Sequence, residues 1–324
     1  MSRICLYYKR EAEGDRWLVG DRYIRHLARR LVRGKSRLSG IEKVFANLCL
    51  GLDKLGIKYY INLPFNQLHE SDFVGVLGAG KGCLNGYRKS NSIVAGIGLM
   101  THPSEWSTLC KDYPIVKYLQ HSEWANNIYK PYFGDRCQIW AVGIDTETWQ
   151  NQQTIMKTTD FLIYDKIMWN YDIKSKQILR PIRELLNDKG LTFKELRYGS
   201  YNPQDYKNIL SSCRSMIFLC EHESQGLAYQ ECLSSDVPIL AWDQGEYLDP
   251  NRFKWGDPYI RATSVPYWSN RCGIKFQNIN EFPNKLEEFL DNLSSQYFAP
   301  RDYILNNLTL EKCAKNYLDI LLNI

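Results

Sequence analysis

The stretch MIFLCEHESQGLAYQECL (residues 216–233), continued by DVPILA (residues 236–241), decides the fold. An apolar run, a short acidic loop, a helical segment and a second apolar run follow one another, which predicts strand, loop, helix and strand. Gly226 stands where the loop turns into the helix. A helix N-terminus there offers unpaired N–H groups and the positive end of the helix dipole, and glycine lets a ligand approach the backbone. The stretch therefore predicts an anion-binding turn within a parallel α/β unit.

The rest of the chain repeats this alternation of short β-branched or aromatic runs and longer helical patterns. Such alternation is typical of parallel sheets covered by helices on both faces. The predicted strands are residues 4–8, 59–61, 73–77, 93–97, 116–119 and 139–142 in the first half, and 161–164, 196–198, 216–219 and 239–242 in the second. An apolar stripe over residues 44–55 predicts a helix that Gly56 ends, and two helical patterns, 281–293 and 303–322, close the chain.

The length of 324 residues is about right for two domains of average size. A polar segment, residues 150–158, lies between the two sets of strands and predicts a linker. We therefore expect two Rossmann-like α/β domains, residues 1–145 and 146–300, that face each other across a cleft. The last segment, residues 301–324, is expected to be a helix that packs back toward the first domain.

Composition narrows the class of protein. Hydrophobic residues make up 44% of the chain and charged residues 24%, which is typical of a globular protein. No window approaches 18 consecutive apolar residues, and the N-terminus runs directly into a predicted strand, so we expect a soluble, cytoplasmic protein. The 10 cysteines form no C-x-x-C pair, which favours reduced thiols. Without any Asp-x-Asp pair, neither a metal nor another cofactor is expected.

Two glutamates give the acidic loop and its helix a more specific pattern. Glu223 and Glu231 are separated by seven residues, and Val237-Pro238 follows. In this pattern the chain resembles the family-four-like retaining glycosyltransferases, which have the two-domain GT-B fold. The segment around Gly40, SGIEK (residues 39–43), resembles the glycine-rich turn of that family's acceptor domain. Two further segments, QHSEW (residues 120–124) and VGIDT (residues 142–146), resemble its last N-domain helix start and its interdomain junction.

The resemblance implies an enzyme that transfers a sugar from a nucleotide-sugar donor to an acceptor hydroxyl with retention of configuration. The acceptor would lie at the N-terminal domain and the donor at the C-terminal one. Glu223 would contact the donor sugar and Glu231 the ribose. The backbone of the intervening turn would hold the sugar and the diphosphate, through Ser224, Gln225, Gly226 and Leu227. Gly40 would line the donor from the other domain.

Three further site residues follow from the resemblance. Basic side chains after the first strand of the second domain offset diphosphate charge in that family. The family's Arg and Lys five apart are missing here, so Lys166 takes this role, with Lys174 or Lys176 as substitutes. His102 is the candidate for the histidine directed at the sugar, although a lone histidine is often structural. Tyr201 is the candidate for stacking on the base.

A basic segment between Arg22 and Arg33 (residues 22–33) has an apolar stripe and a complementary arginine-rich face. This pattern predicts an amphipathic helix. It can lie on an anionic membrane, making the protein peripheral to the inner face, or hold an anionic acceptor. A core-packed helix with a solvated basic face fits equally well, and no nucleic-acid partner is expected.

Three other interpretations fit parts of the sequence. Residues 75–81 have the spacing of a phosphate-binding Walker loop, but Gly82 replaces the hydroxyl residue that would hold magnesium. A sugar-nucleotide epimerase of the same architecture and a non-catalytic sugar-binding relative both remain open as alternatives to a transferase.

Overall fold

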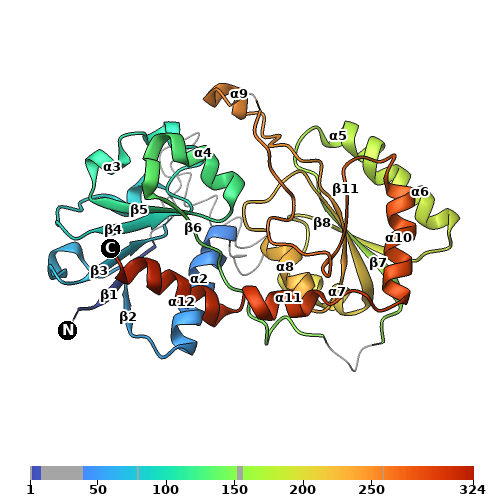
Figure 1. The fold of residues 1–324 in the computed structure, drawn as a ribbon, viewed down its shortest axis with the longest axis horizontal. Helices are drawn as coiled ribbons and strands as arrows, with labels where there is room; N and C mark the ends of the chain where they lie inside the picture. The colour runs from blue at the N-terminus through green and yellow to red at the C-terminus, as the bar shows by residue number, and fades with distance from the viewer. Residues whose placement is uncertain (1, 9–38, 79, 152–155, 258) are drawn as a thin grey trace, which may run out of the picture.

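The computed structural model of the protein describes residues 2–8, 39–78, 80–151, 156–257 and 259–324. These residues form two parallel sheets with helices packed around them. The strand order is β2-β1-β3-β4-β5-β6 in the first sheet and β11-β10-β9-β7-β8 in the second. Each sheet is the centre of its own lobe, and the two lobes lie side by side (Figure 1). The predicted α/β fold with two Rossmann-like domains is confirmed.

The N-terminal lobe contains the first sheet. Its strands are β1 (Ile4–Tyr7), β2 (Tyr59–Ile61), β3 (Phe73–Val76), β4 (Ile93–Gly96), β5 (Ile115–Gln120) and β6 (Cys137–Ile139). Its helices are α2 (Gly40–Lys54), α3 (Leu109–Asp112) and α4 (Glu123–Phe133), with short 3-10 turns at η1 (Phe65–Gln67), η2 (Lys81–Leu84), η3 (Pro103–Trp106) and η4 (Gly134–Arg136). Helix α2 begins with a capping box, because Ser39 accepts from the backbone of Glu42 while the Glu42 carboxylate accepts from the backbone of Ser39.

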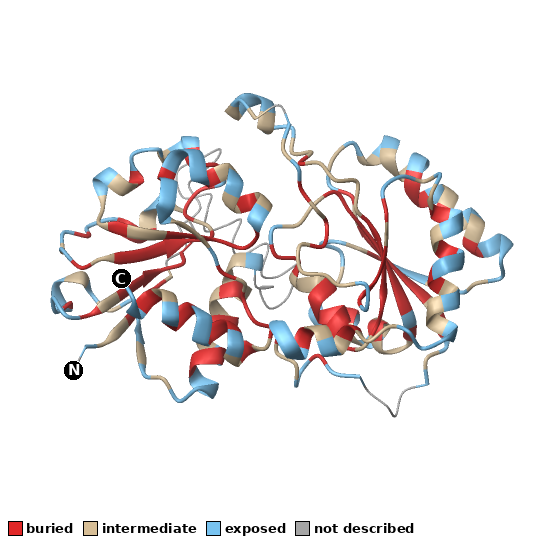
Figure 2. Cartoon of the chain, in the orientation of Figure 1, coloured by how far each residue is buried: buried red, intermediate tan, exposed pale blue. Residues whose placement is uncertain are grey.

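The C-terminal lobe contains the second sheet. Its strands are β7 (Thr159–Lys166), β8 (Phe193–Arg197), β9 (Cys213–Cys220), β10 (Ile239–Trp242) and β11 (Gly273–Phe276). Its helices are α5 (Tyr171–Lys174), the π-helical η5 (Ser175–Leu179), α6 (Arg180–Asp188), α7 (Pro203–Ser211), α8 (Leu227–Ser234), α9 (Arg252–Trp255) and α10 (Phe282–Ser294). Buried residues gather along the strands of both lobes (Figure 2). A parallel sheet covered on both faces requires such apolar strands.

Most predicted strands fall within three residues of the observed bounds, but one predicted strand was wrong and one observed strand was not predicted. The strand expected at residues 139–142 ends at Ile139, and Val142 instead hydrogen-bonds through its backbone with the side chain of Gln225. Strand β11 was not expected, because GIKF opens with a glycine and carries only two strongly apolar residues. It forms because its backbone pairs with β10.

The single closing helix expected at residues 303–322 was also wrong. The structure has two helices there, α11 (Pro300–Asn307) and α12 (Leu310–Leu322). Between them Leu308 accepts a hydrogen bond from the backbone N–H of Ile144, and Thr309 caps α12 by accepting from Lys312. Helix α11 packs on α8 of the C-terminal lobe, whereas α12 packs on α2 and β3 of the N-terminal lobe. The chain therefore returns to the first lobe before it ends (Figure 1).

No helix within the described parts of the chain is long and apolar enough to cross a membrane. The 10 cysteines all lie in described residues and are free thiols.

The contact between α2 and α12 depends on a glycine. A β-carbon at Gly51 would lie 2.5 Å from the carbonyl oxygen of Leu310 and 2.7 Å from the β-carbon of Ala314. The two helix backbones can approach this closely only because Gly51 has no side chain.

We predict that Gly51→Val destabilises the protein by about 1–3 kcal/mol, the usual range for overpacking. Valine is a better helix former than glycine, so a loss must come from the clash with α12. Leu50→Val is the matched control, because Leu50 is the neighbouring α2 residue and is 45% exposed. Urea unfolding of both variants measures the difference, and equal stabilities would contradict the packing argument.

Candidate functional site

The residues of the acidic loop lie at the carboxyl edge of the second sheet. Strand β9 ends at Cys220, and residues 221–226 lead directly into α8. The neighbouring strand β7 runs parallel to β9, in a register that places Lys166 opposite Cys220. Ligands of open parallel sheets bind at this edge. The register therefore brings Lys166 next to the acidic loop.

Lys166 and Glu223 form an ion pair, with Nζ donating to Oε1. Their side chains are only 18% and 12% exposed, and Nζ also lies 4.5 Å from the ring centroid of Tyr198. Desolvation on its own lowers the pKa of Lys166, but the Glu223 carboxylate outweighs it and the pKa is raised. The ammonium group therefore remains charged beside the loop.

The sequence analysis missed Glu221, which fixes the shape of this loop. Its fully buried carboxylate accepts from the backbone N–H of Met168 at 3.0 Å and of Trp169 at 3.3 Å. Lys174 donates to the same carboxylate at 2.9 Å. Lys174, considered as a substitute for Lys166, is thus bound to Glu221. A glutamate directly after the apolar run at residues 216–220 is the signal that points to a buried, paired carboxylate.

Gly226 has a φ of 80°, in the left-handed region, and forms the N-cap of α8. A β-carbon there would lie 2.1 Å from the ring of Tyr229. The glycine is therefore required both by the turn and by the tyrosine beneath it. Ser224 is exposed at the outside of the same turn, and Leu227 packs into the cores of both lobes.

Gln225 holds the loop to the segment that connects the lobes. Its side chain is buried, accepts from the backbone N–H of Val142 at 3.1 Å and donates to the carbonyl oxygen of Val142 at 3.3 Å. It also donates to Gln230 at 2.8 Å. The side chain is fully engaged in these contacts, so a ligand would meet the backbone of this residue.

Glu231 lies in the second turn of α8, and its carboxylate accepts from Nζ of Lys43. Lys43 belongs to the first turn of α2, so this ion pair joins the two lobes. Gly40, where α2 begins, has open space around its α-carbon, because nothing lies within 4 Å of a β-carbon placed there. The structure therefore brings the predicted residues Gly40 and Glu231 to the same junction through Lys43, which the sequence analysis did not single out.

His102 contacts an extension of the C-terminal lobe that we call the arm, residues 244–257 and 259–262, with α9 (Arg252–Trp255) at its tip. The Nε2 atom of His102 lies 2.6 Å from Oδ2 of Asp257, and Nδ1 lies 2.7 Å from Oγ of Ser104. The imidazole also stacks on Trp255, with ring centroids 4.7 Å apart. His102 is only 1% exposed, and its contacts with Asp257 and Trp255 show that the arm packs against the imidazole.

Tyr201 follows β8 and forms a hydrogen bond between its hydroxyl group and that of Tyr164. Its ring packs edge-on against the ring of Tyr164, and its ring centroid lies 5.7 Å from that of Tyr206. Tyr201 is partly buried against the core of the C-terminal lobe. The proposed stacking on a base stays a prediction.

Three aromatic rings surround His222 in a cluster that sequence patterns did not reveal. The ring of His222 stacks on Trp169 at 5.0 Å and lies 5.3 Å from Trp124 and 4.8 Å from Tyr247. Trp124 comes from α4 of the N-terminal lobe and donates to the carbonyl oxygen of Glu223 at 2.9 Å. Burial, followed by the nearby lysines 166 and 174 and Arg252, lowers the pKa of His222 to about 3. Its imidazole is therefore neutral at physiological pH.

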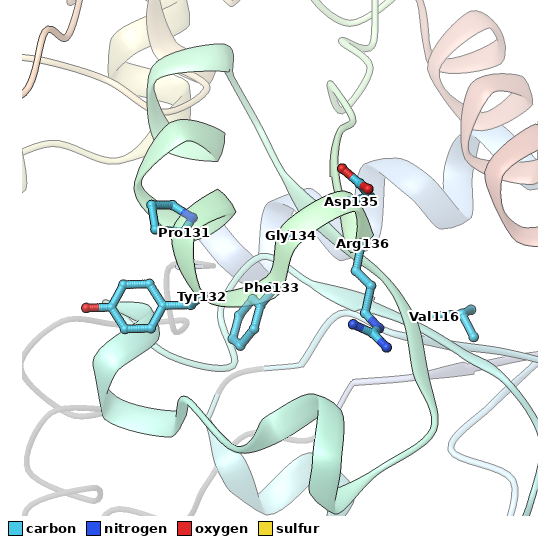
Figure 3. A pocket seen from close by; sticks show the side chains of 7 residues that line it. All are labelled: Val116, Pro131, Tyr132, Phe133, Gly134, Asp135 and Arg136. Atoms are coloured by element: carbon cyan, nitrogen blue, oxygen red, sulfur yellow. The ribbon is translucent and has the colours of Figure 1, made fainter.

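Other surfaces contribute nothing to this constellation. Figure 3 shows a shallow pocket lined by Val116 and residues 131–136. Val116 lies near the N-terminal end of β5, whereas the candidate site lies at the carboxyl ends of the strands. Among the described side chains, no group of three His, Cys, Asp or Glu could hold a metal ion. The basic segment between Arg22 and Arg33 lies outside the described residues.

No model of a protein family matches the sequence, and no curated protein matches it either. Solved structures do resemble it. The pneumococcal O-GlcNAc transferase GtfA, in complex with UDP and GlcNAc, superposes with a TM-score of 0.50 at 10% identity over 80% of this chain and 58% of that one. TarM of S. aureus superposes with a TM-score of 0.51 at 13% identity over 86% of this chain and 58% of that one. The chain thus spans less than two thirds of the length of either.

A third structure matches over nearly the whole of both chains. Sucrose-phosphate synthase from Thermosynechococcus elongatus has a TM-score of 0.50 at 9% identity, covering 99% of this chain and 98% of that one. At such identities the similarity defines the fold. The protein has the GT-B architecture of two Rossmann-like domains that these glycosyltransferases share.

The buried histidines predict a pH dependence of stability. The folded-state pKa of His222 is about 3 and that of His121 is about 4, both lowered first by burial. Below pH 6.5 each of these imidazoles binds a proton in the unfolded chain but stays neutral in the folded chain. The free energy of unfolding therefore falls by about 1.4 kcal/mol for each imidazole and for each unit by which the pH is lowered. Since phenylalanine binds no proton, His222→Phe should lower the pH dependence of the free energy of unfolding between pH 6.5 and 4 by the contribution of one imidazole. Urea unfolding at several pH values measures it, and an unchanged slope would contradict the buried, neutral state.

The contact of His102 with the arm predicts a second measurable effect. Asp257→Ala removes the acceptor of the His102 Nε2–H group, and we expect faster amide hydrogen exchange in the arm with unchanged exchange in both sheets. Lys254→Ala is the control, because Lys254 is an exposed residue of the same arm. If both variants exchange alike, the hydrogen bond does not hold the arm.

Proposed function

We propose that the protein is a glycosyltransferase that moves a sugar from a nucleotide-sugar donor to an acceptor hydroxyl group with retention of configuration. One observation carries this proposal: the two glutamates of the motif lie on either side of the Gly226 turn, and each is paired with a lysine. The arrangement combines carboxylates for hydroxyl groups with cations for phosphates. The fold shared with the O-GlcNAc transferase and with TarM supports it.

The donor is assigned to the C-terminal lobe. The diphosphate would bind the backbone N–H groups at the start of α8, where the helix dipole favours an anion. Glu223 in the loop would then accept hydroxyl groups of the transferred sugar, and Glu231, one turn into the helix, those of the ribose. Tyr201, at the end of β8, is the candidate for contact with the base.

The chemistry follows from charge that develops as the glycosidic bond breaks. The leaving diphosphate gains negative charge, and the charged ammonium group of Lys166 lies beside the loop that would hold it. Lys166 would exchange its contact with Glu223 for one with phosphate, which frees the Glu223 carboxylate for the sugar. The leaving phosphate would itself accept the proton of the acceptor hydroxyl, so no nucleophile from the protein is required.

The acceptor is assigned to the N-terminal lobe, with His102 directed at the sugar. This role requires the arm to release the imidazole, because Asp257 and Ser104 now occupy both ring nitrogens. Movement of the arm would thus accompany substrate binding.

Thermal shift measurements across UDP-, GDP- and ADP-sugars would identify the donor. A ligand at 100 times its Kd adds about 2.7 kcal/mol of apparent stability. Following the best donor alone by NMR separates a transferase from an epimerase, because an epimerase converts the donor without an acceptor. A protein that binds the donor and neither transfers nor converts it would be a sugar-binding relative.

The two glutamates predict contrasting losses. Glu231→Gln should weaken binding of the free nucleoside diphosphate roughly tenfold or more, since hydrogen bonds to a charged group contribute about 1.5–3 kcal/mol. Glu223→Gln should leave that affinity nearly unchanged, because the ligand lacks the sugar, yet it should lower the transfer rate steeply.

Calorimetry with the nucleoside diphosphate and a transfer assay on both folded variants give the measurement. Glu184→Gln is the control, because Glu184 lies on the far helix α6 and is 57% exposed. Equal losses at Glu223 and Glu231, or none at either, would refute the donor-site assignment.

A further inference from the structure

A cation from the N-terminal lobe reaches the donor side of the junction. Lys43 lies in the first turn of α2, 188 residues away in sequence from Glu231, and its Nζ donates to the Glu231 carboxylate. The Nζ atom also lies 5.5 Å from the ring centroid of Trp149, and the side chain is 31% exposed. Lys43 is therefore held at the junction while part of it remains accessible to a ligand.

The position of Glu231 relates Lys43 to the proposed phosphate site. Glu231 comes five residues after Gly226, which corresponds to about 7.5 Å along a helix axis. A cation bound to this carboxylate thus lies near the turn whose N–H groups would hold the diphosphate. Lys166 lies near the other end of the same turn, through Glu223. The two lysines flank the Gly226 turn from different lobes.

The charges at the turn support an exchange of partners. The Glu231 side chain is only 4% exposed, and a carboxylate buried to that degree requires a partner. Lys43 supplies it in the structure described. When ribose hydroxyl groups donate to Glu231, the ammonium group of Lys43 can turn to the phosphate oxygens, where it gains charge-assisted hydrogen bonds.

We infer that Lys43 is a second diphosphate-binding cation of the donor site, contributed by the N-terminal lobe. The inference rests on the proposed function and adds a residue that the Glu-x7-Glu pattern does not contain. Lys43 would thus supply a second cation in a chain that lacks the Arg and Lys pair expected after β7. Because the cation comes from the opposite lobe, tight binding of the diphosphate requires both lobes to be in contact with it.

The same helix provides a matched control. Lys54 lies at the last turn of α2 and pairs with Glu147 and Glu311, whose side chains are 77% and 42% exposed. It carries the same charge as Lys43 on the same helix, but at the end away from the Gly226 turn. A general effect of lowering the positive charge of α2 would appear equally in Lys54→Met.

The experiment compares a nucleoside diphosphate with its unphosphorylated nucleoside. Uridine, guanosine and adenosine diphosphates are titrated into wild-type protein by calorimetry, and the tightest is kept with its nucleoside. Lys43→Met should lose roughly tenfold in affinity for the diphosphate. It should bind the nucleoside equally well or more tightly, because Glu231 no longer has to release Lys43. Lys43→Arg should retain most of the diphosphate affinity, and Lys54→Met all of it.

Three outcomes would overturn the inference. Unchanged diphosphate affinity in Lys43→Met refutes it while leaving the donor site intact. Equal losses for diphosphate and nucleoside show that Lys43 only positions Glu231. If wild-type protein binds none of the three diphosphates, the proposed function fails and this inference with it. Should Lys43→Met not fold, the double variant Lys43→Met with Glu231→Gln removes both charges of the pair. Its diphosphate affinity is compared with that of Glu231→Gln alone, and equal affinities would refute the inference.

Discussion

The parallel pairing of β7 with β9 is the constraint on which the site depends. Its register sets Lys166 opposite Cys220, so that an ammonium group stands where the chain turns into the acidic loop. Two of the loop's carboxylates are largely buried, and each has a lysine, Glu221 with Lys174 and Glu223 with Lys166. Burying such charges is tolerable only with a partner. The lysine partners therefore hold the loop in the shape that presents the Gly226 turn at the sheet edge.

The site is also a junction between lobes. The side chain of Gln225 binds the backbone of Val142 in the connecting segment, and Lys43 of α2 binds Glu231 of α8. Helices α11 and α12 pack on opposite lobes, and the arm reaches His102 from the C-terminal side. Since Gln225 belongs to the acidic loop and Glu231 to α8, the loop and its helix both contact the other side of the junction. If the proposed donor binds at this loop, its binding is linked to the arrangement of the lobes through these contacts.

Weak sequence similarity is compatible with this shared architecture. Identity to the solved glycosyltransferases is between 9% and 13% in the matches described, yet both sheets are parallel and follow the expected order of helices and strands. A parallel sheet requires apolar strands, short turns and covering helices, and many sequences satisfy these demands. Function depends instead on a few side chains at the strand ends. Hence the fold is shared with these proteins at low identity, and the proposed activity depends on the lysine and glutamate pairs.

The sequence by itself determined the α/β class, most strands and the place of the Gly226 turn, because hydrophobic periodicity and glycine conformation are local properties of the chain. It also marked Lys166 as a strand-end residue. Only the tertiary structure decided which charges meet. Lys43 is 188 residues from Glu231, His102 is 155 from Asp257, and Trp124 is 99 from Glu223. Such contacts depend on how two lobes and an arm pack together, and no local pattern encodes that packing. The break at Leu308 and Thr309 belongs to the same category, because the α11–α12 turn is bonded to Ile144 in the connecting segment.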